Sequence, residues 1–332
     1  MQAEINAVHK SKQNKRIGST LSALSVIFLL IIMLTGAKDA AVYVKNAFSV
    51  CIKSVIPSVF PMMVISGMLI SGWGGEMIAQ IFGSFVSHIF GVSRGAAPAV
   101  ILGFICGFPI GAASAAKLYE KGIISKEELT HLLTFVNNPG AAFVIFSVGG
   151  SMLGSVRLGV MIYLSVIISA TISGLLFGRV MGVKPTPIRK SPTCTASLSE
   201  IVVSSVSSAT TGALNVCAFA AFFSALVGVI SGLLERAGAS FQLRAAIFGF
   251  FELIGGVSIL TKSGSETFAA LSSAAVCSWS GVSVLMQIAA VCRLSIGKEK
   301  LSLSPMILSK SLQATLSPLF LLLLIKITRF DI

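Results

Sequence analysis

The chain has 332 residues, of which 55% are hydrophobic and 11% charged, and its mean hydropathy is +0.92. Soluble domains carry about 25% charged residues, so this composition excludes an ordinary water-soluble globule. The formal net charge of +13 comes from lysines and arginines that stand singly or in short runs between apolar segments. That pattern is typical of the positive-inside bias of membrane proteins rather than of nucleic-acid binding. We therefore expect a multi-pass protein of the cell membrane, with the lipid bilayer as its partner and no nucleic acid.

Residues 1–16 are polar and basic and are expected to be a cytoplasmic N-terminus. Residues 17–36 form the first apolar run. A crossing needs roughly 20 apolar residues, whereas the apolar core of a cleaved signal peptide has about 7–15. The run is therefore predicted to be an uncleaved transmembrane anchor.

Residues 37–182 are expected to form a first structural repeat, and its beginning is irregular. Residues 39–56 carry lysines at helical spacing among apolar residues, which predicts an amphipathic helix at the membrane interface. Residues 62–71 follow two prolines and are too short to cross alone. A turn is expected at Trp73, and residues 76–92 are predicted to be a second amphipathic helix.

The rest of this repeat contains two interrupted segments and one plain span. Residues 95–116 are apolar but broken by glycines and a proline, and the polar stretch after them places Glu120 in a solvated cluster with two lysines. A helix is predicted to begin at Ser125 and to stop at Asn137-Asn138-Pro139-Gly140. Residues 156–181 are predicted to span the membrane without interruption.

A basic, proline-rich linker is predicted over residues 183–199, and a second repeat over residues 200–332. A serine-rich amphipathic piece is expected at 198–211 and a separate span at 214–234. The remaining segments are apolar: residues 242–262 contain Glu252, residues 268–293 are interrupted around Ser280, and residues 305–327 contain Lys310 and Pro318.

Both halves thus show a first broken segment, a second broken segment and a plain span, in that order. Within hydrocarbon every backbone N–H and C=O needs a partner, so irregular backbone survives only where protein or a wet cavity covers it. Glycines also serve close helix packing. Four breaks in two ordered pairs nevertheless favour a shared polar cavity at mid-membrane, as in transporters built from inverted repeats.

Glu252 is the sharpest candidate residue, because a carboxylate inside a membrane helix costs about 2.5–3.5 kcal/mol to insert. It would bind a ligand, hold a coupling proton or sodium, or make a structural hydrogen bond to a neighbouring broken helix. Asn137 and Asn138 offer donors and acceptors that suit either ligand binding or helix capping. The weaker candidates for ligand binding are Gly107, Pro109, Ser280 and Gln287.

An enzyme is not indicated. The sequence contains no HExxH, P-loop or dinucleotide fingerprint, and its three histidines are far apart. The six cysteines show no CxxC spacing and lie mostly in apolar stretches. We therefore expect no catalytic residues, no cofactor, no metal site and no disulfide framework.

Several motifs resemble those of a known family. In the first half they are Gly107-Phe108-Pro109-Ile110-Gly111-Ala112, Leu118-Tyr119-Glu120-Lys121-Gly122-Ile123-Ile124-Ser125 and Phe135-Val136-Asn137-Asn138-Pro139-Gly140. In the second half they are Phe251-Glu252-Leu253 with Gly255-Gly256, and Ser280-Gly281-Val282-Ser283-Val284 with Gln287. These motifs resemble the two nucleoside-recognition, or gate, regions of the YlbJ family of sporulation integral membrane proteins, over residues 55–324. One departure is Ser280-Gly281, preceded by Trp279, where the family pattern has two glycines.

The resemblance implies an all-α polytopic fold of two related repeats with broken or re-entrant helices, like the gate domain of nucleoside transporters. It implies a sporulation protein that binds or moves a small polar solute, a nucleoside or an envelope precursor, for spore cortex and coat maturation. One repeat would rock against the other, and a coupling ion and a second copy of the chain are candidate partners. The alternative is a membrane scaffold for spore-envelope assembly that transports nothing.

Overall fold

The computed structural model describes residues 20–186, 196–296 and 301–330, and this part of the chain is helical without strands. An unlabelled helix, Thr20–Thr35, comes first. The labelled elements are α2 (Ala37–Val50), η1 (Cys51–Val55), α3 (Ile56–Ser71), α4 (Gly74–Phe90), η2 (Arg94–Ala96), α5 (Ala97–Cys106), α6 (Ile110–Glu120), α7 (Lys126–Leu132), η3 (Phe143–Met152), α8 (Val156–Met181), α9 (Leu198–Arg236), α10 (Phe241–Phe251), α11 (Leu253–Leu260), α12 (Glu266–Trp279), α13 (Gly281–Ile296) and α14 (Ser304–Thr328).

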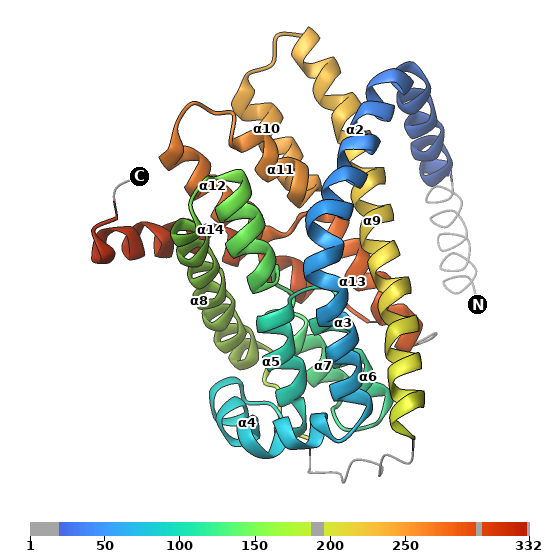
Figure 1. The fold of residues 1–332 in the computed structure, drawn as a ribbon, viewed down its shortest axis with the longest axis vertical. Coiled ribbons are helices and arrows are strands. Elements are labelled where there is room, and N and C mark those ends of the chain that lie inside the picture. Colours follow the sequence, from blue (N-terminus) through green and yellow to red (C-terminus); the bar gives the residue numbers. More distant parts are fainter. Residues whose placement is uncertain (1–19, 187–195, 297–300, 331–332) are drawn as a thin grey trace, which may run out of the picture.

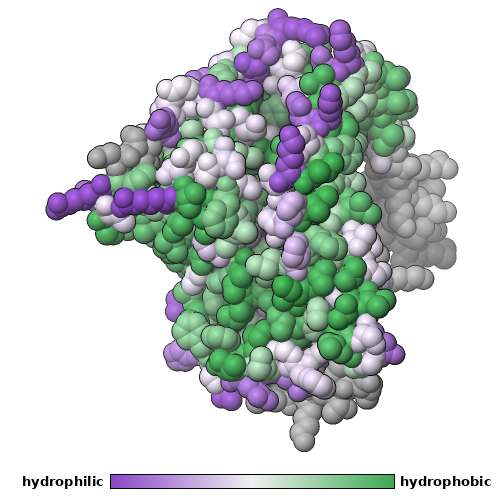
Figure 2. Space-filling model, viewed as in Figure 1, coloured by the Kyte–Doolittle hydropathy of each residue, from purple (hydrophilic) through white to green (hydrophobic). Residues whose placement is uncertain are grey.

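In the described residues, five helical stretches are long and apolar enough to cross a membrane: Ala37–Ser71, α8, α9, Glu266–Arg293 and α14. A sixth crossing is added if α4 and the segment Arg94–Cys106, which are bent by 108° at their junction, count as one broken span. Figure 2 shows a broad apolar surface between hydrophilic patches at the two ends of the molecule. The prediction of a multi-pass, all-helical membrane protein is confirmed.

The prediction of an interfacial helix at 39–56 followed by a separate short piece is wrong, because Ala37–Ser71 is one stretch of 35 residues. Pro57 lacks an N–H, and its ring would clash with the carbonyl four residues earlier in a regular helix. The stretch widens into a π-helical turn, η1, immediately before that proline. Such a bulge accommodates the interruption without ending the helix.

The second correction concerns α9, which joins the predicted serine-rich piece and the predicted span into a single helix of 39 residues. Its hydroxyls do not interrupt it, because they donate to their own helix. Thr210 Oγ1 donates to the Val206 carbonyl and Thr211 Oγ1 to the Ser207 carbonyl. A capping box of Ser197 and Glu200 starts the helix, so the linker ends earlier than predicted. Residues 1–16 and 187–195, which hold the predicted N-terminus and most of the linker, lie outside the described residues.

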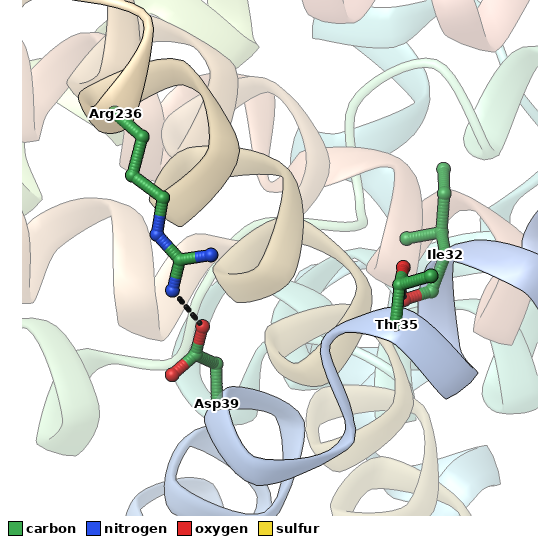
Figure 3. Close-up of polar contacts among 4 residues, drawn as sticks. All are labelled: Ile32, Thr35, Asp39 and Arg236. Carbon is green, nitrogen blue, oxygen red and sulfur yellow. Dashed lines mark hydrogen bonds and ion pairs between the residues drawn. The ribbon is translucent and has the colours of Figure 1, made fainter.

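The two longest helical stretches, Ala37–Ser71 and α9, lie side by side and are called here the long-helix pair (Figure 1). They are antiparallel. Gly67, near the end of the first, lies against Ser205, near the start of the second. At the other end Asp39 and Arg236 form an exposed ion pair of 3.2 Å (Figure 3). The helix Thr20–Thr35, the described part of the expected anchor, turns into α2 at Gly36, where a Cβ would lie 2.3 Å from Val229.

Each half contains a helical hairpin folded back at a break. The first hairpin is α5–α6, and a Cβ on Gly111 would lie 3.0 Å from the Gly103 Cα. The second hairpin is α10–α11, and a Cβ on Gly256 would lie 2.5 Å from the Gly249 Cα. The missing side chains let the two arms touch. Figure 1 shows the first hairpin near the beginning of α9 and the second near its end, so the predicted pair of related, re-entrant segments is present.

The remaining predictions of order along the chain agree with the structure. A capping box of Ser125 and Glu128 begins α7, and the chain is irregular over residues 137–140. A second break at Ser280, with φ of 71°, separates α12 from α13. The uninterrupted helices α8 and α14 close the two halves and pack against each other.

Candidate functional site

The tip of the first hairpin lies directly on the break at residues 137–140, and we call this contact the first junction. The Phe108 N–H donates to the Asn138 carbonyl over 2.8 Å. Gly107 has φ of +80°, and a Cβ there would lie 2.2 Å from the Gly140 nitrogen. Pro109 follows a cis peptide bond and precedes α6. Gly107 and Pro109, both predicted as site residues, therefore belong to a packed backbone contact.

The two predicted asparagines are fully buried in this junction. Asn137 Nδ2 donates to the Leu133 carbonyl over 3.2 Å and Asn138 Nδ2 to the Phe135 carbonyl over 2.7 Å. Asn137 thus binds the carbonyl of the C-cap residue of α7, and Asn138 binds a carbonyl of the turn that follows this helix. The Asn137 Oδ1 atom has no hydrogen-bond partner among the described residues.

Helix α14, from the second half, completes the first junction with a row of donors. Lys310 Nζ donates to Asn138 Oδ1 over 3.0 Å. Ser309 Oγ and Gln313 Nε2 both donate to the Thr134 carbonyl over 2.7 Å. Ser309, Lys310 and Gln313 are fully buried. Lys310 was not among the predicted site residues, although a single lysine within an apolar helix is the same kind of signal as Glu252.

The tip of the second hairpin carries Glu252 and lies on the break between α12 and α13, a contact we call the second junction. Glu252 is 2% exposed. Its Oε1 accepts from the Ile254 N–H over 2.9 Å, and its Oε2 accepts from the Gly255 N–H over 2.5 Å and from Ser224 Oγ over 3.3 Å. The carboxylate is thus the N-cap of α11, the helix that follows it in the chain.

Gly281 brings the two segments of the second junction together. It has φ of +87°, and a Cβ there would lie 3.0 Å from the Phe251 carbonyl oxygen. Ser280 Oγ donates to the Cys277 carbonyl within α12 over 3.1 Å. Gln287 is buried on α13, where its Nε2 donates to Ser283 Oγ over 3.4 Å and its Oε1 lacks a partner among the described residues. The seven predicted residues therefore belong to the two junctions and to α13, and Phe108 at the tip of the first hairpin packs against the apolar cluster that contains Leu253 and Cys277.

A cavity of about 480 Å³ lies between α3, α6 and α9, where the first hairpin meets the long-helix pair. Of the seven predicted residues, only Pro109 lines it. Most of its polar lining consists of hydroxyl groups. The polar lining residues are Ser66, Ser71, Ser114, Lys117, Glu120, Ser204, Ser205, Ser207, Ser208, Thr211 and Asn215.

Glu120, which was expected in a solvated cluster with Lys117 and Lys121, is exposed in the structure, and both lysines are half-buried. Lys117 and Glu120 line the cavity. Lys117 Nζ donates to Ser71 Oγ over 2.6 Å, and Lys121 Nζ donates to the Ile70 carbonyl over 2.9 Å. Ser71 and Ile70 stand at the end of α3, the last part of the helical stretch Ala37–Ser71, which had been predicted as two separate pieces.

A smaller cavity, of about 180 Å³, lies at the corresponding place on the second hairpin, between α2, α9 and α11. Its polar lining includes Tyr43, Asn46, Ser224, Ser258 and Lys262. Ser224 is the hydroxyl that donates to Glu252. Both cavities therefore lie on the boundary between the long-helix pair and a hairpin, whereas the junctions themselves are close backbone contacts.

Metal chemistry has no evident site in the described part of the chain, where no group of three or more His, Cys, Asp and Glu side chains is close enough to hold an ion. Five of the six cysteines are described, and each is a buried free thiol.

No protein-family model and no curated protein matches the chain. Solved structures of CNTnw, a bacterial concentrative nucleoside transporter, are similar to it. A variant in a state called intermediate 1 has a TM-score of 0.54 at 16% identity, over 88% of this chain and 86% of that one. A variant in an outward-facing state has a TM-score of 0.50 at 14% identity, over 92% of this chain and 87% of that one. The chain is thus a multi-pass integral membrane protein with the fold of a concentrative nucleoside transporter.

Proposed function

We propose that the chain binds a small polar solute in the 480 Å³ cavity and moves it across the membrane. The observation that carries this proposal is the position of the cavity, between the first hairpin and the long-helix pair. Its volume lies within the range of about 300–1,000 Å³ that small-molecule sites occupy. The similar fold of CNTnw, a nucleoside transporter, supports a nucleoside as the first solute to test.

The chemistry of the lining suits a neutral solute with several hydroxyl or amide groups. Serine and threonine hydroxyls both donate and accept hydrogen bonds, and Asn215 offers an amide with both capacities. Ser205 Oγ is buried at the cavity and has no partner among the described residues. Lys117 and Glu120 add one charge of each sign.

Movement of the solute would take place at the boundary that holds both cavities. The long-helix pair takes one member from each half, and α8 of the first half packs on α12 and α14 of the second. The two repeats therefore interlock, which disfavours the rocking of one whole repeat against the other. We propose instead that the hairpins and the helices packed on them shift against the long-helix pair.

The test is uptake of radiolabelled nucleosides and cell-wall precursors by proteoliposomes that contain the full chain. Ser208 and Asn215 line the cavity and are exposed to it on α9. Ser208→Leu combined with Asn215→Leu should lower uptake at least about tenfold, which corresponds to roughly 1.4 kcal/mol of lost binding. Thr210→Leu, exposed on the same helix but outside the cavity lining, is the matched control and should keep wild-type uptake.

If the wild-type chain moved none of these solutes, the proposal would be wrong and the scaffold alternative would be favoured. The role in spore cortex and coat maturation rests on the sequence resemblance to the sporulation family. Its test is deletion of the chain in a spore-forming host, with heat-resistant spores counted and the Ser208→Leu/Asn215→Leu variant compared with Thr210→Leu in complementation.

A further inference from the structure

Lys310 is a fully buried lysine within a helix that is long and apolar enough to span the membrane. Removing an ammonium group from water costs several kcal/mol even after relaxation of the protein. Ionisable residues at such positions are rare and usually mark a site of function, with the partner of the charge as the first thing to identify.

No carboxylate compensates this charge in the described part of the chain. The ion pairs there are Asp39–Arg236 and Glu235–Arg244, and neither involves Lys310. The buried carboxylates are Glu128 and Glu252. Glu252 accepts from the start of α11, and Glu128 accepts from the backbone at residues 93 and 125 and from Thr186.

A neutral oxygen of the first junction, on the side chain of Asn138, is bound in place of a carboxylate. Nζ of Lys310 donates to Asn138 Oδ1 over 3.0 Å. An amide oxygen carries partial negative charge and accepts a hydrogen bond from an ammonium group. Asn138 also accepts the Phe108 N–H through its main-chain carbonyl. One asparagine therefore connects the ammonium to the tip of the first hairpin.

We propose that the Lys310 ammonium is a built-in cation of the first junction, which binds the Asn138 side-chain oxygen where a free cation would otherwise have to bind. The hairpin tip is then held by a cation that cannot leave, and solute movement needs no sodium. The second part of this inference rests on the proposed function, whereas the first part does not. If Lys310 is a built-in cation, shortening its side chain should leave a space that binds a small cation.

The test is thermal unfolding of the purified full chain in detergent. Lys310→Ala should lower the unfolding temperature by several degrees, and added methylammonium or ethylammonium chloride should restore most of the loss, while choline chloride, whose cation is too bulky, should not. Lys310→Met fills the space without charge and should be destabilised and insensitive to every cation. Lys326→Ala, an exposed lysine of the same helix, is the control and should behave as the wild type.

Lys310→Met that unfolds at the wild-type temperature would overturn the proposal, as would a wild-type chain that sodium chloride stabilises more than choline chloride. The unfolding temperature of Lys310→Met and the comparison of the two salts on the wild-type chain still decide the question if Lys310→Ala does not fold. In proteoliposomes, wild-type nucleoside uptake should be equal in sodium and in choline buffers. Uptake that requires sodium would also overturn the built-in cation, whereas no uptake in either buffer would remove the transport proposal and leave the unfolding measurements to decide the role of Lys310.

Discussion

Each junction contains one buried charged side chain that binds polar groups at a helix break, and the two charges have opposite signs. At the second junction a helix begins, and its free N–H groups are bound by the carboxylate of Glu252. At the first junction a helix ends, and oxygens there are bound by the ammonium of Lys310 and by two neutral donors. Helix starts favour anions and helix ends favour cations. The position of Glu252 is therefore explained by the helix start that it caps, whereas Lys310 binds a side-chain amide in the irregular segment beyond a helix end.

The junctions also differ in how tightly the backbone is packed, and the glycines provide the largest expected effect. Gly107→Ala would place a Cβ 2.2 Å from the Gly140 nitrogen, in addition to a positive φ. With ψ of −160° this backbone conformation is one that essentially only glycine adopts, and it costs other residues about 1–3 kcal/mol; overpacking typically adds about 1–3 kcal/mol. We expect little folded protein, measured as the monodisperse fraction after extraction in detergent.

Alanine substitutions at two other glycines with positive φ allow a comparison in which the space around the new Cβ increases step by step. Gly281→Ala has a similar φ but meets the Phe251 carbonyl oxygen only at 3.0 Å, and Gly238→Ala has φ of +80° with nothing within 4 Å. Unfolding temperatures should therefore fall in the order Gly238→Ala, Gly281→Ala, Gly107→Ala, from the least to the most affected. Equal losses in all three variants would mean that backbone conformation, and not the tightness of the first junction, sets the cost.

Glu252→Gln tests the anionic side of the comparison and should have the next largest effect. The substitution replaces one carboxylate oxygen by an NH₂ group, which would then face the N–H of Ile254 or Gly255. A buried donor without an acceptor costs about 1–3 kcal/mol. We expect a lower unfolding temperature in detergent. Glu266→Gln, at an exposed position in the first turn of α12, is the matched control and should change little.

The breaks could be predicted from the sequence because the residues that make them are local signals. Asn137-Asn138-Pro139-Gly140 cannot continue a helix, Ser125 and Glu128 form a capping box, and the span 156–181 has no interruption. Glu252 was also found, because a carboxylate in an apolar run is conspicuous. In each case the chemistry that decides the structure lies within a few residues of the chain.

The long helices and the cavity could not be predicted in this way. Pro57 reads as a helix end unless a π-turn precedes it, and the serines of α9 read as a separate surface piece unless the facing helices are known. Lys117 meets Ser71 across 46 positions of the chain, and Lys310 meets Asn138 across 172. Such partners depend on which helices become neighbours, and that is a property of the packed fold.

The exposed ion pair at the end of the long-helix pair gives the smallest expected effect and a reference for the buried charges. Arg236 and Asp39 lie 3.2 Å apart, with side chains 70% and 41% exposed. Water and salt screen such a pair, which typically contributes less than about 1 kcal/mol. Arg236→Gln should therefore shift the unfolding temperature only slightly, and the shift should shrink further at high salt, whereas the loss in Lys310→Met should not. A large, salt-independent loss in Arg236→Gln would mean that the contact between α2 and α9 depends on this pair more than on the apolar packing around Val229.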